Sequence, residues 1–375
     1  PYYYTRLEAD KAVVLSMNAY WRRVLGERPG LPAASDDLEA SVTGGWIEPE
    51  HGAMLHRSPR RLASWSWRAH DAPQGLCLPP DSGHLAEWTA NMGGIVRLLG
   101  EGGRRTVVAH AQTLFDGGFL TTGTMADSQK AVLPEGWTAT ERAHHKYAVA
   151  ALPDDRTMLV LEFCRLGPRS YLGEVKGLKL NVPNDLFNGY LRTYTSAGGA
   201  LTLDGHDVGE RALGGCWVCV DDRIGAVGVY GADGFTVAQA GRRRASGYGD
   251  SLYYDELCFP CREGALAVDP GTVVLDCGSA VLSGATAQET ARVAQTCAAL
   301  ECAQASVRAT FIEGADGTGY VLMANFGDEP VSASIELGRQ VSAARNVGTG
   351  ERVSVADATV ALDLAADEAM LLALE

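Results

Sequence analysis

The chain has 375 residues, of which 46% are hydrophobic, and its formal net charge is −14. A chain of this length can bury a substantial core and is long enough for two domains. The acidic balance argues against a nucleic-acid partner, because a phosphate backbone would be repelled. No run of about 20 apolar residues occurs, so the sequence predicts no membrane partner either.

Cysteine usage and the first residue bear on where the protein works. Nine cysteines with no evident pairing favour a reducing, cytoplasmic compartment, and secretion after removal of an upstream signal is the alternative. The chain begins at Pro1, and no signal-peptide pattern follows. We therefore expect that Pro1 is a cut or processed terminus and that the chain is a segment of a longer protein.

Two Cys-x-x-Cys pairs raise the question of a structural zinc ion. The four thiols belong to Cys216, Cys219, Cys258 and Cys261. The first pair falls in a predicted strand, where residues three apart point to opposite faces and grip one ion poorly. We expect separate buried thiols and no cofactor, with zinc at these four residues, or Ca²⁺ near Asp221 and Asp222, as the alternatives.

The N-terminal part of the chain predicts strands and one polar sheet face. Residues 2–24 mix aromatic and β-branched side chains, which is typical of strands. In the segment 62–70, alternation places Ser64, Ser66 and Arg68 on one face and Trp65 and Trp67 on the other. Arg68 and Trp67 are candidate substrate contacts.

A polar cluster follows at residues 84–91. His84, Glu87 and Asn91 are spaced by three and four residues, so they would share one side of a helical turn. This spacing predicts a second group of candidate substrate contacts.

The densest polar stretch begins with a predicted hairpin. Its turn is Pro153-Asp154-Asp155-Arg156, and the flanking residues alternate in the manner of strands. In this register Tyr147 lies opposite Glu162 and His145 opposite Cys164, on one face. The other face then holds His144, Lys146, Phe163 and Arg165.

A loop rich in polar and aromatic residues continues this stretch, from residue 181 to residue 194. Its candidate site residues are Asn184, Asp185, Asn188, Tyr190, Arg192 and Tyr194. Several of these groups have no evident role in a core, so the loop is a candidate ligand contact.

The rest of the chain predicts mostly short strands. One helix is expected near residues 287–302, because Thr286 and Glu289 have the spacing of a capping box. Short alternating strands follow residue 305. We predict an all-β, mainly antiparallel fold, with a large β-sandwich at residues 1–304 and a small β-sandwich at 305–375. No dinucleotide, phosphate-loop, zinc-protease or Gly-x-Ser-x-Gly motif is present.

Several segments together resemble a known group of proteins. They are the His144–Val149 strand, the Leu161-Glu162-Phe163 strand end, the Asn184–Tyr190 loop and the Trp217–Gly225 hairpin. They resemble the β-supersandwich, galactose-mutarotase-like domain of polysaccharide lyases of the heparinase II/III type. The final strands resemble the small β-sandwich that closes many glycoside hydrolases. Those lyases usually carry an α-helical toroid before the sandwich, and this chain has none. The resemblance therefore implies that an N-terminal catalytic domain, either such a toroid or a hydrolase barrel, precedes Pro1 in the parent protein.

The resemblance implies a carbohydrate-active protein acting on an oligo- or polysaccharide. A lyase needs a base at C5, an acid for the leaving oxygen and a group that neutralises the uronate carboxylate. The candidate base is His144 or His145; the candidate acids are Tyr147, Tyr190 and Tyr194; the carboxylate contacts are Arg68, Asn188 and Arg192. A glycoside hydrolase would instead use two carboxylates, from Glu87, Glu162 and Asp185. A non-catalytic glycan-binding or structural module is the alternative from another class.

Overall fold

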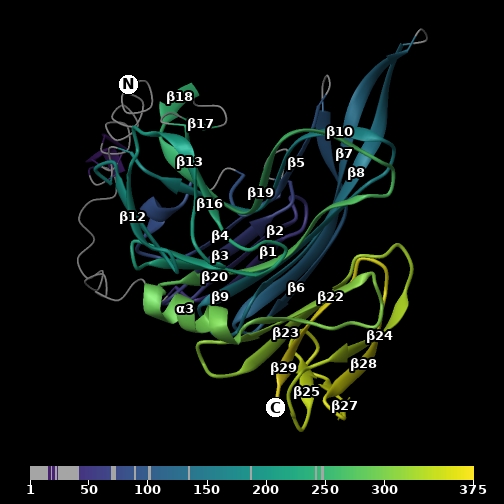
Figure 1. Cartoon of the computed structure of the whole chain (residues 1–375). Helices are drawn as coiled ribbons and strands as arrows, with labels where there is room; N and C mark the ends of the chain where they lie inside the picture. Colours follow the sequence, from purple (N-terminus) through teal and green to yellow (C-terminus); the bar gives the residue numbers. More distant parts are fainter. Residues whose placement is uncertain are drawn as a thin grey trace.

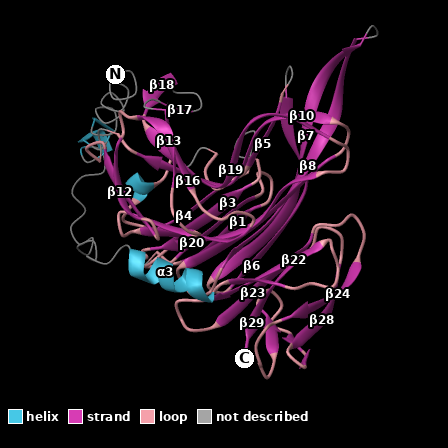
Figure 2. Cartoon of the chain, viewed as in Figure 1, coloured by secondary structure: helices cyan, strands magenta, loops and turns pink. Residues whose placement is uncertain are grey.

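The protein is built almost entirely from antiparallel strands (Figures 1 and 2). The computed structural model describes residues 42–68, 73–87, 90–99, 103–133, 136–185, 188–240, 243–245 and 249–375, together with 16, 17, 19–21 and 23. The sheets in these ranges are antiparallel, which confirms the predicted all-β fold class.

The largest sheet is the middle layer of the molecule. Within the described residues it holds nine strands in the order β12-β11-β14-β15-β20-β9-β8-β7-β6. Their bounds are β6 (Gly103–Phe115), β7 (Gly118–Leu133), β8 (Gly136–Ala151), β9 (Thr157–Leu166), β11 (Leu191–Ser196), β12 (Gly199–Asp204), β14 (Trp217–Val220), β15 (Ile224–Tyr230) and β20 (Val273–Ser283). β9 is buried along nearly its whole length, because the sheet is covered on both faces.

The predicted central hairpin is confirmed in register and in faces. β8 pairs with β9 so that Tyr147 lies opposite Glu162 and His145 opposite Cys164. The period of two sends the side chain of Val149 into the core above the sheet, together with Tyr147. The neighbouring alanines of β8 point into the core below it.

Two further sheets cover the upper face of the nine-stranded sheet. Within the described residues, one has four strands in chain order and the other has five in the order β13-β16-β19-β10-β5. The bounds are β1 (Gly44–Glu48), β2 (Ala53–Arg57), β3 (Leu62–Ser66), β4 (Gln74–Leu78), β5 (Ile95–Leu98), β10 (Ser170–Pro183), β13 (Val208–Ala212), β16 (Thr236–Ala240) and β19 (Tyr254–Val268), with the short pair β17 (Arg243–Ala245) and β18 (Gly249–Leu252) beside them. Trp65, Phe119, Leu178 and Phe259 are fully buried in the core that these layers share.

The C-terminal module packs under the lower face of the nine-stranded sheet (Figure 1). Its strands are β21 (Ala298–Leu300), β22 (Val307–Glu313), β23 (Gly319–Asn325), β24 (Val331–Glu336), β25 (Ala344–Asn346), β26 (Arg352–Val353), β27 (Val355–Ala356), β28 (Thr359–Leu364) and β29 (Ala369–Leu374). Ile312, Leu322 and Leu371 join the lower core of the nine-stranded sheet, so the two parts share buried apolar surface.

Helix α3 (Ala287–Thr296) lies between the two parts and begins at the predicted capping box. The backbone N–H of Thr286 donates to the Glu289 carboxylate at 2.9 Å, and the Glu289 N–H donates to the Thr286 hydroxyl. The predicted end near residue 302 is wrong. Cys297 is extended, and β21 follows it and pairs with β22, so the module's first strand precedes the predicted boundary at 305.

Two other predictions from the N-terminal part are wrong. Of residues 2–24, which were predicted as strands, residues 16, 17, 19–21 and 23 are helical, in keeping with the good helix formers Met17 and Ala19, and the others lie outside the described residues. The segment 84–91 is not one helical turn. A 3-10 helix, η1 (Gly83–Leu85), stops at the extended Ala86, because Glu87 donates its N–H to the carbonyl of Asn181 in β10.

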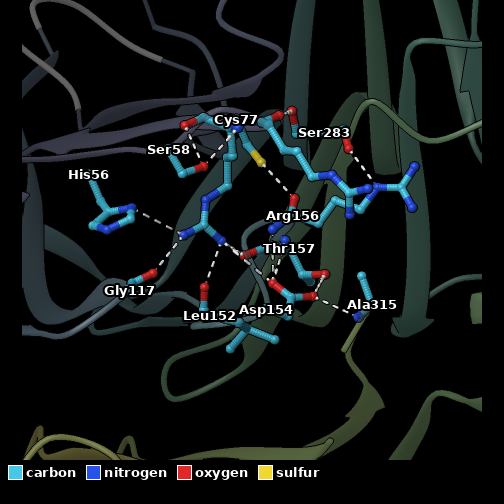
Figure 3. Close-up of polar contacts among 12 residues, drawn as sticks. His56, Ser58, Cys77, Gly117, Leu152, Asp154, Arg156, Thr157, Ser283 and Ala315 are labelled. Carbon is cyan, nitrogen blue, oxygen red and sulfur yellow. Dashed lines mark hydrogen bonds and ion pairs between the residues drawn. The ribbon is translucent and has the colours of Figure 1, made fainter. Parts of the chain in front are cut away.

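Arg61, in the β2–β3 turn, is the centre of a buried polar network, and Figure 3 labels its partners Gly117, Leu152, Asp154 and Thr157. Its guanidinium is fully buried and donates to the carbonyls of Leu152 (2.8 Å), Thr157 (2.7 Å) and Gly117 (3.0 Å). It also lies 3.6 Å from the carboxylate of Asp154, in the β8–β9 turn. One side chain thus ties the four-stranded sheet to two turns of the nine-stranded sheet.

Candidate functional site

The face of the hairpin that carries His145, Tyr147 and Glu162 is a hydrogen-bonded cluster inside the protein. The imidazole Nε2 of His145 lies 3.1 Å from Glu162 Oε2, and its Nδ1 lies 3.1 Å from the Tyr147 hydroxyl. The Tyr147 hydroxyl also donates to the carbonyl of Gly94 at 3.3 Å. The rings of His145 and Tyr147 stack with centroids 4.2 Å apart.

Burial dominates the electrostatics of this cluster. It lowers the pKa of His145 well below 6.5 and raises the pKa of Glu162 well above 4.5, because the interior disfavours both charged forms. The nearby Arg105 guanidinium lowers the pKa of His145 further and opposes the rise at Glu162. Both shifts favour a neutral imidazole beside a protonated carboxyl group.

No part of this cluster is open to a polysaccharide. The side chains of His145 and Glu162 are fully buried, and Tyr147 is 1% exposed. Gly94 covers them so closely that a Cβ there would overlap the Glu162 carboxylate and lie 3.0 Å from His145 Cε1. The predicted hairpin cluster is therefore a buried polar network in this fold.

The predicted loop does not join this cluster. Gly94 packs against the carbonyl of Lys176 in β10, whereas the loop begins after Pro183, at the end of that strand. At about 3.3 Å per residue, seven to eight residues of strand separate the two by roughly 25 Å. The hairpin residues and the loop residues cannot line one active site.

The other face of the hairpin meets the C-terminal module. His144 is half exposed and lies 3.1 Å from the Glu141 carboxylate. Lys146 is nearly buried and pairs with Asp328 (2.8 Å) and Asp367 (2.9 Å) of the module. These contacts assign Lys146 to the packing of the two parts.

Most polar groups of the predicted loop are satisfied inside the protein. The Asn184 amide donates to Asp255 Oδ2 at 3.1 Å, and the Tyr194 hydroxyl donates to the same atom at 2.7 Å. Arg192 pairs with Asp221 at 2.6 Å and is 3% exposed. Asp185 is also buried, and its N–H is held by the side chain of Asn188, at 2.6 Å.

The remaining predicted contacts are scattered. Trp67 is fully buried, and its indole N–H donates to the Thr121 hydroxyl at 2.8 Å, so it offers no face to a ligand. Arg68 is exposed at the end of β3. His84 is exposed on η1, whereas Asn91 is buried and bridges β4 to β10 through Gly75 O and Asn181 N. Glu87 is half buried.

Tyr190 is the one predicted catalytic residue of the loop that reaches the surface within the described part of the chain. Its ring lies 4.1 Å from that of His206 and 5.5 Å from that of Tyr253, measured between centroids. Its φ of 63° is in the left-handed region, which non-glycine residues rarely adopt. Sequence reasoning missed His206 and Tyr253, because they come from separate segments that only the fold brings together.

The cysteines do not assemble into a zinc site in the described residues. Cys216 and Cys219 lie at β14 of the nine-stranded sheet, and Cys258 lies on β19 of the five-stranded sheet. Burial raises the pKa of the Cys219 thiol to about 12, which opposes the thiolate form that a metal needs. No group of three or more His, Cys, Asp or Glu side chains suited to a metal ion is found in this part of the chain. The side chain of Cys261 lies outside the described residues.

A groove of about 290 Å³ lies on the outer face of the four-stranded sheet. The strand registers place Trp46, Leu55, Ser64 and Leu76 in one row across the sheet. The adjacent row is Glu48, Ala53, Ser66 and Gln74. The opposite face carries Trp65 and other core residues, so alternation alone puts these two rows outside. We call this feature the Trp46 groove.

The groove combines an aromatic side chain, an apolar floor and a polar edge. Trp46 is 53% exposed. At the edge, the Glu48 carboxylate accepts the backbone N–H of His51 at 2.8 Å and lies 2.7 Å from its imidazole Nδ1. The backbone hydrogen bond from His51 is the main reason why the pKa of Glu48 is lowered, so this carboxylate is ionised and held in place. Ser64 and Ser66 belong to the polar face expected from the sequence, but Trp46 and Glu48 gave no signal there.

No family model matches the sequence, and no curated protein matches it. Among solved structures, the chain is similar to the galactosidase domain of the alpha-galactosidase-sucrose kinase AgaSK, with 6% identity and a TM-score of 0.38 over 64% of this chain and 41% of that one. It is also similar to an alpha-galactosidase from Lactobacillus brevis, with 8% identity and a TM-score of 0.39 over 64% and 40%. A Glycoside Hydrolase Family 97 enzyme from Pseudoalteromonas sp. strain K8 has 9% identity and a TM-score of 0.24 over 64% and 36%.

The chain thus spans about two fifths of the length of these enzymes. Identities and TM-scores of this size do not place it in either group. No helix among the described residues is long and apolar enough to cross a membrane.

Proposed function

We propose that this chain is a glycan-binding β-sandwich of a carbohydrate-active protein, and that the Trp46 groove holds the sugar. The observation that carries the proposal is an exposed tryptophan beside an apolar floor, with hydroxyl groups and an ionised carboxylate at the edge. Stacking on Trp46 and hydrogen bonds to Glu48 are the two expected modes of contact.

The chemistry of a pyranose ring matches this arrangement. One face of the ring presents C–H groups, which pack well on an indole ring, and the rim presents hydroxyl groups. A carboxylate that is already ionised and positioned accepts hydrogen bonds from sugar hydroxyls without further ordering. A volume near 290 Å³ is at the lower end for ligand pockets, so the groove suits a short stretch of glycan.

A polysaccharide lyase is the second candidate, and the pair Tyr190–His206 favours it. A neutral imidazole can take a proton from C5, and a phenol can protonate the leaving oxygen. Burial and the neighbouring Tyr253, Asp185 and Asp204 raise the pKa of Tyr190, which suits an acid. The same carboxylates would repel a uronate, and for this reason we rank the lyase second.

Substitution of Trp46 tests the glycan-binding proposal. Loss of the indole in Trp46→Ala should weaken binding of a neutral oligosaccharide about two- to tenfold, measured by calorimetry against a panel of glycans. Trp21→Ala is the matched control, because Trp21 is 48% exposed and lies outside the groove. Equal affinities for wild type and Trp46→Ala would contradict the proposal.

The lyase candidate has its own assay. We would incubate the chain with uronate polysaccharides and follow the absorbance of the unsaturated uronide. We expect binding that depends on Trp46, and no product. Product formation that Tyr190→Phe lowers, with glycan affinity unchanged, would establish the lyase in its place.

A further inference from the structure

A second hollow lies at the other end of the four-stranded sheet. Its volume is about 440 Å³, and it is lined by the β2–β3 turn, the segment after β4, the β14–β15 turn and the start of α3. The pairing of Leu62 with Leu78 marks this end of the sheet, whereas the pairing of Ser66 with Gln74 marks the end near the Trp46 groove. We call the hollow the arginine cleft.

The lining of this cleft is positive in an acidic protein. Arg60, Arg156 and Arg223 line it together with Asp81 and Glu289, which leaves an excess of one positive charge. The chain as a whole carries −14. A local positive site in a negative field attracts an anion selectively, because other surfaces of the protein repel it.

Free donors remain on two of the arginines. Arg223 uses Nη2 to donate to Asp81 Oδ1 and to Ser82 Oγ, at 2.6 Å each, and its Nε and Nη1 have no partner among the described residues. The side chain of Arg60 is exposed, and its guanidinium makes no hydrogen bond or ion pair within the described part of the chain. A guanidinium with free N–H groups binds a carboxylate through two parallel hydrogen bonds.

The cleft is also preorganised. The Ser283 hydroxyl donates to the backbone carbonyl of Arg60 at 2.7 Å, which fixes the origin of that side chain. Arg156 donates from Nε to the Ser283 carbonyl at 3.0 Å (Figure 3). Its Nη1 donates to Glu289 at 2.9 Å, so both ends of the guanidinium are held in place. A rigid site lowers the entropy cost of ligand binding.

We propose that the arginine cleft binds the carboxylate of an acidic sugar, with Arg60 and Arg223 as the contacting residues. The rings of Pro59, Pro79 and Pro80 line the same cleft and provide apolar surface for the sugar carbons. This proposal rests on the glycan-binding function, but it uses a surface separate from the Trp46 groove.

Calorimetry of the full chain with trigalacturonate, neutral galactotriose and sodium sulfate tests it. Arg60→Ala and Arg223→Gln should each weaken trigalacturonate binding about tenfold or more and leave galactotriose binding unchanged. Arg352→Ala is the control, because it removes the same charge from a side chain that is 69% exposed in the C-terminal module. Binding of trigalacturonate should also weaken with added salt.

The outcomes separate the two proposals. Binding of galactotriose without trigalacturonate, or equal trigalacturonate affinities in wild type and both cleft variants, overturns the acidic-sugar site alone. Full competition by equimolar sulfate overturns the assignment to a sugar acid. If the chain binds neither trisaccharide, both proposals are overturned.

Discussion

Replacing Arg61 with methionine removes the centre of the buried network while keeping most of the apolar stem. The change deletes the donors to three backbone carbonyls and leaves Asp154 without its nearest cation. Removing one partner of a buried ion pair costs about 3–5 kcal/mol, because the other charge stays in the interior.

The contacts of Asp154 place this case at the lower end of that range. Its carboxylate also accepts the N–H groups of Arg156 (3.0 Å), Thr157 (2.9 Å) and Ala315 (3.1 Å) and the Thr157 hydroxyl (2.5 Å). These donors continue to stabilise the anion when Arg61 is gone. We expect Arg61→Met to lower the free energy of unfolding by about 3 kcal/mol. That is a large part of the 5–15 kcal/mol typical of a domain.

Urea unfolding, followed by both tryptophan fluorescence and far-UV circular dichroism, measures this loss. Asp154→Asn and the double variant complete a double-mutant cycle. We expect the loss of unfolding free energy in the double variant to be smaller than the sum of the two single losses by at least about 1 kcal/mol. Arg68→Met is the control, with an expected change within about 0.5 kcal/mol, because Arg68 is exposed. An unchanged unfolding midpoint in Arg61→Met, or strictly additive costs, would refute the role assigned to the pair.

Three further predictions concern other buried groups. Burial lowers the pKa of His56 from 6.5 to about 4. The stability that depends on the neutral imidazole is therefore complete above pH 6.5 and is lost as the pH falls through 4. His56→Gln should flatten the plot of unfolding free energy against pH between these two values. Glu162→Gln should keep near-wild-type urea stability, since burial raises the pKa of this carboxyl and favours its neutral form, whereas Glu162→Ala should destabilise. Lys146→Met leaves Asp328 and Asp367 unpaired, so limited proteolysis of the C-terminal module should be faster than in the wild type.

The hairpin was predictable because its information is local. A turn at 153–156 and alternation on both sides determine which residues face each other, and Tyr147 does lie opposite Glu162. Alternation does not show whether a face of the sheet is buried or exposed. Gly94 and β10, which are far from His145 in the sequence, cover this side chain. A face with a polar sequence pattern is therefore buried between two layers of sheet. A substitution at His145 should therefore lower the folding stability and leave ligand affinity unchanged in the molecules that remain folded.

The same reasoning explains why the Trp46 groove could not be predicted from the sequence. Each of four strands contributes one or two ordinary residues to it, and no stretch of the chain contains more than a fragment of the pattern. A search for dense polar stretches selects residues that hydrogen-bond to one another, and such residues can be buried together because they satisfy each other. Asn184, Arg192 and Tyr194 follow this rule, with all three buried and paired. In a fold of stacked sheets, the surface that remains for a ligand is the one whose polar groups are sparse and whose neighbours come from other strands.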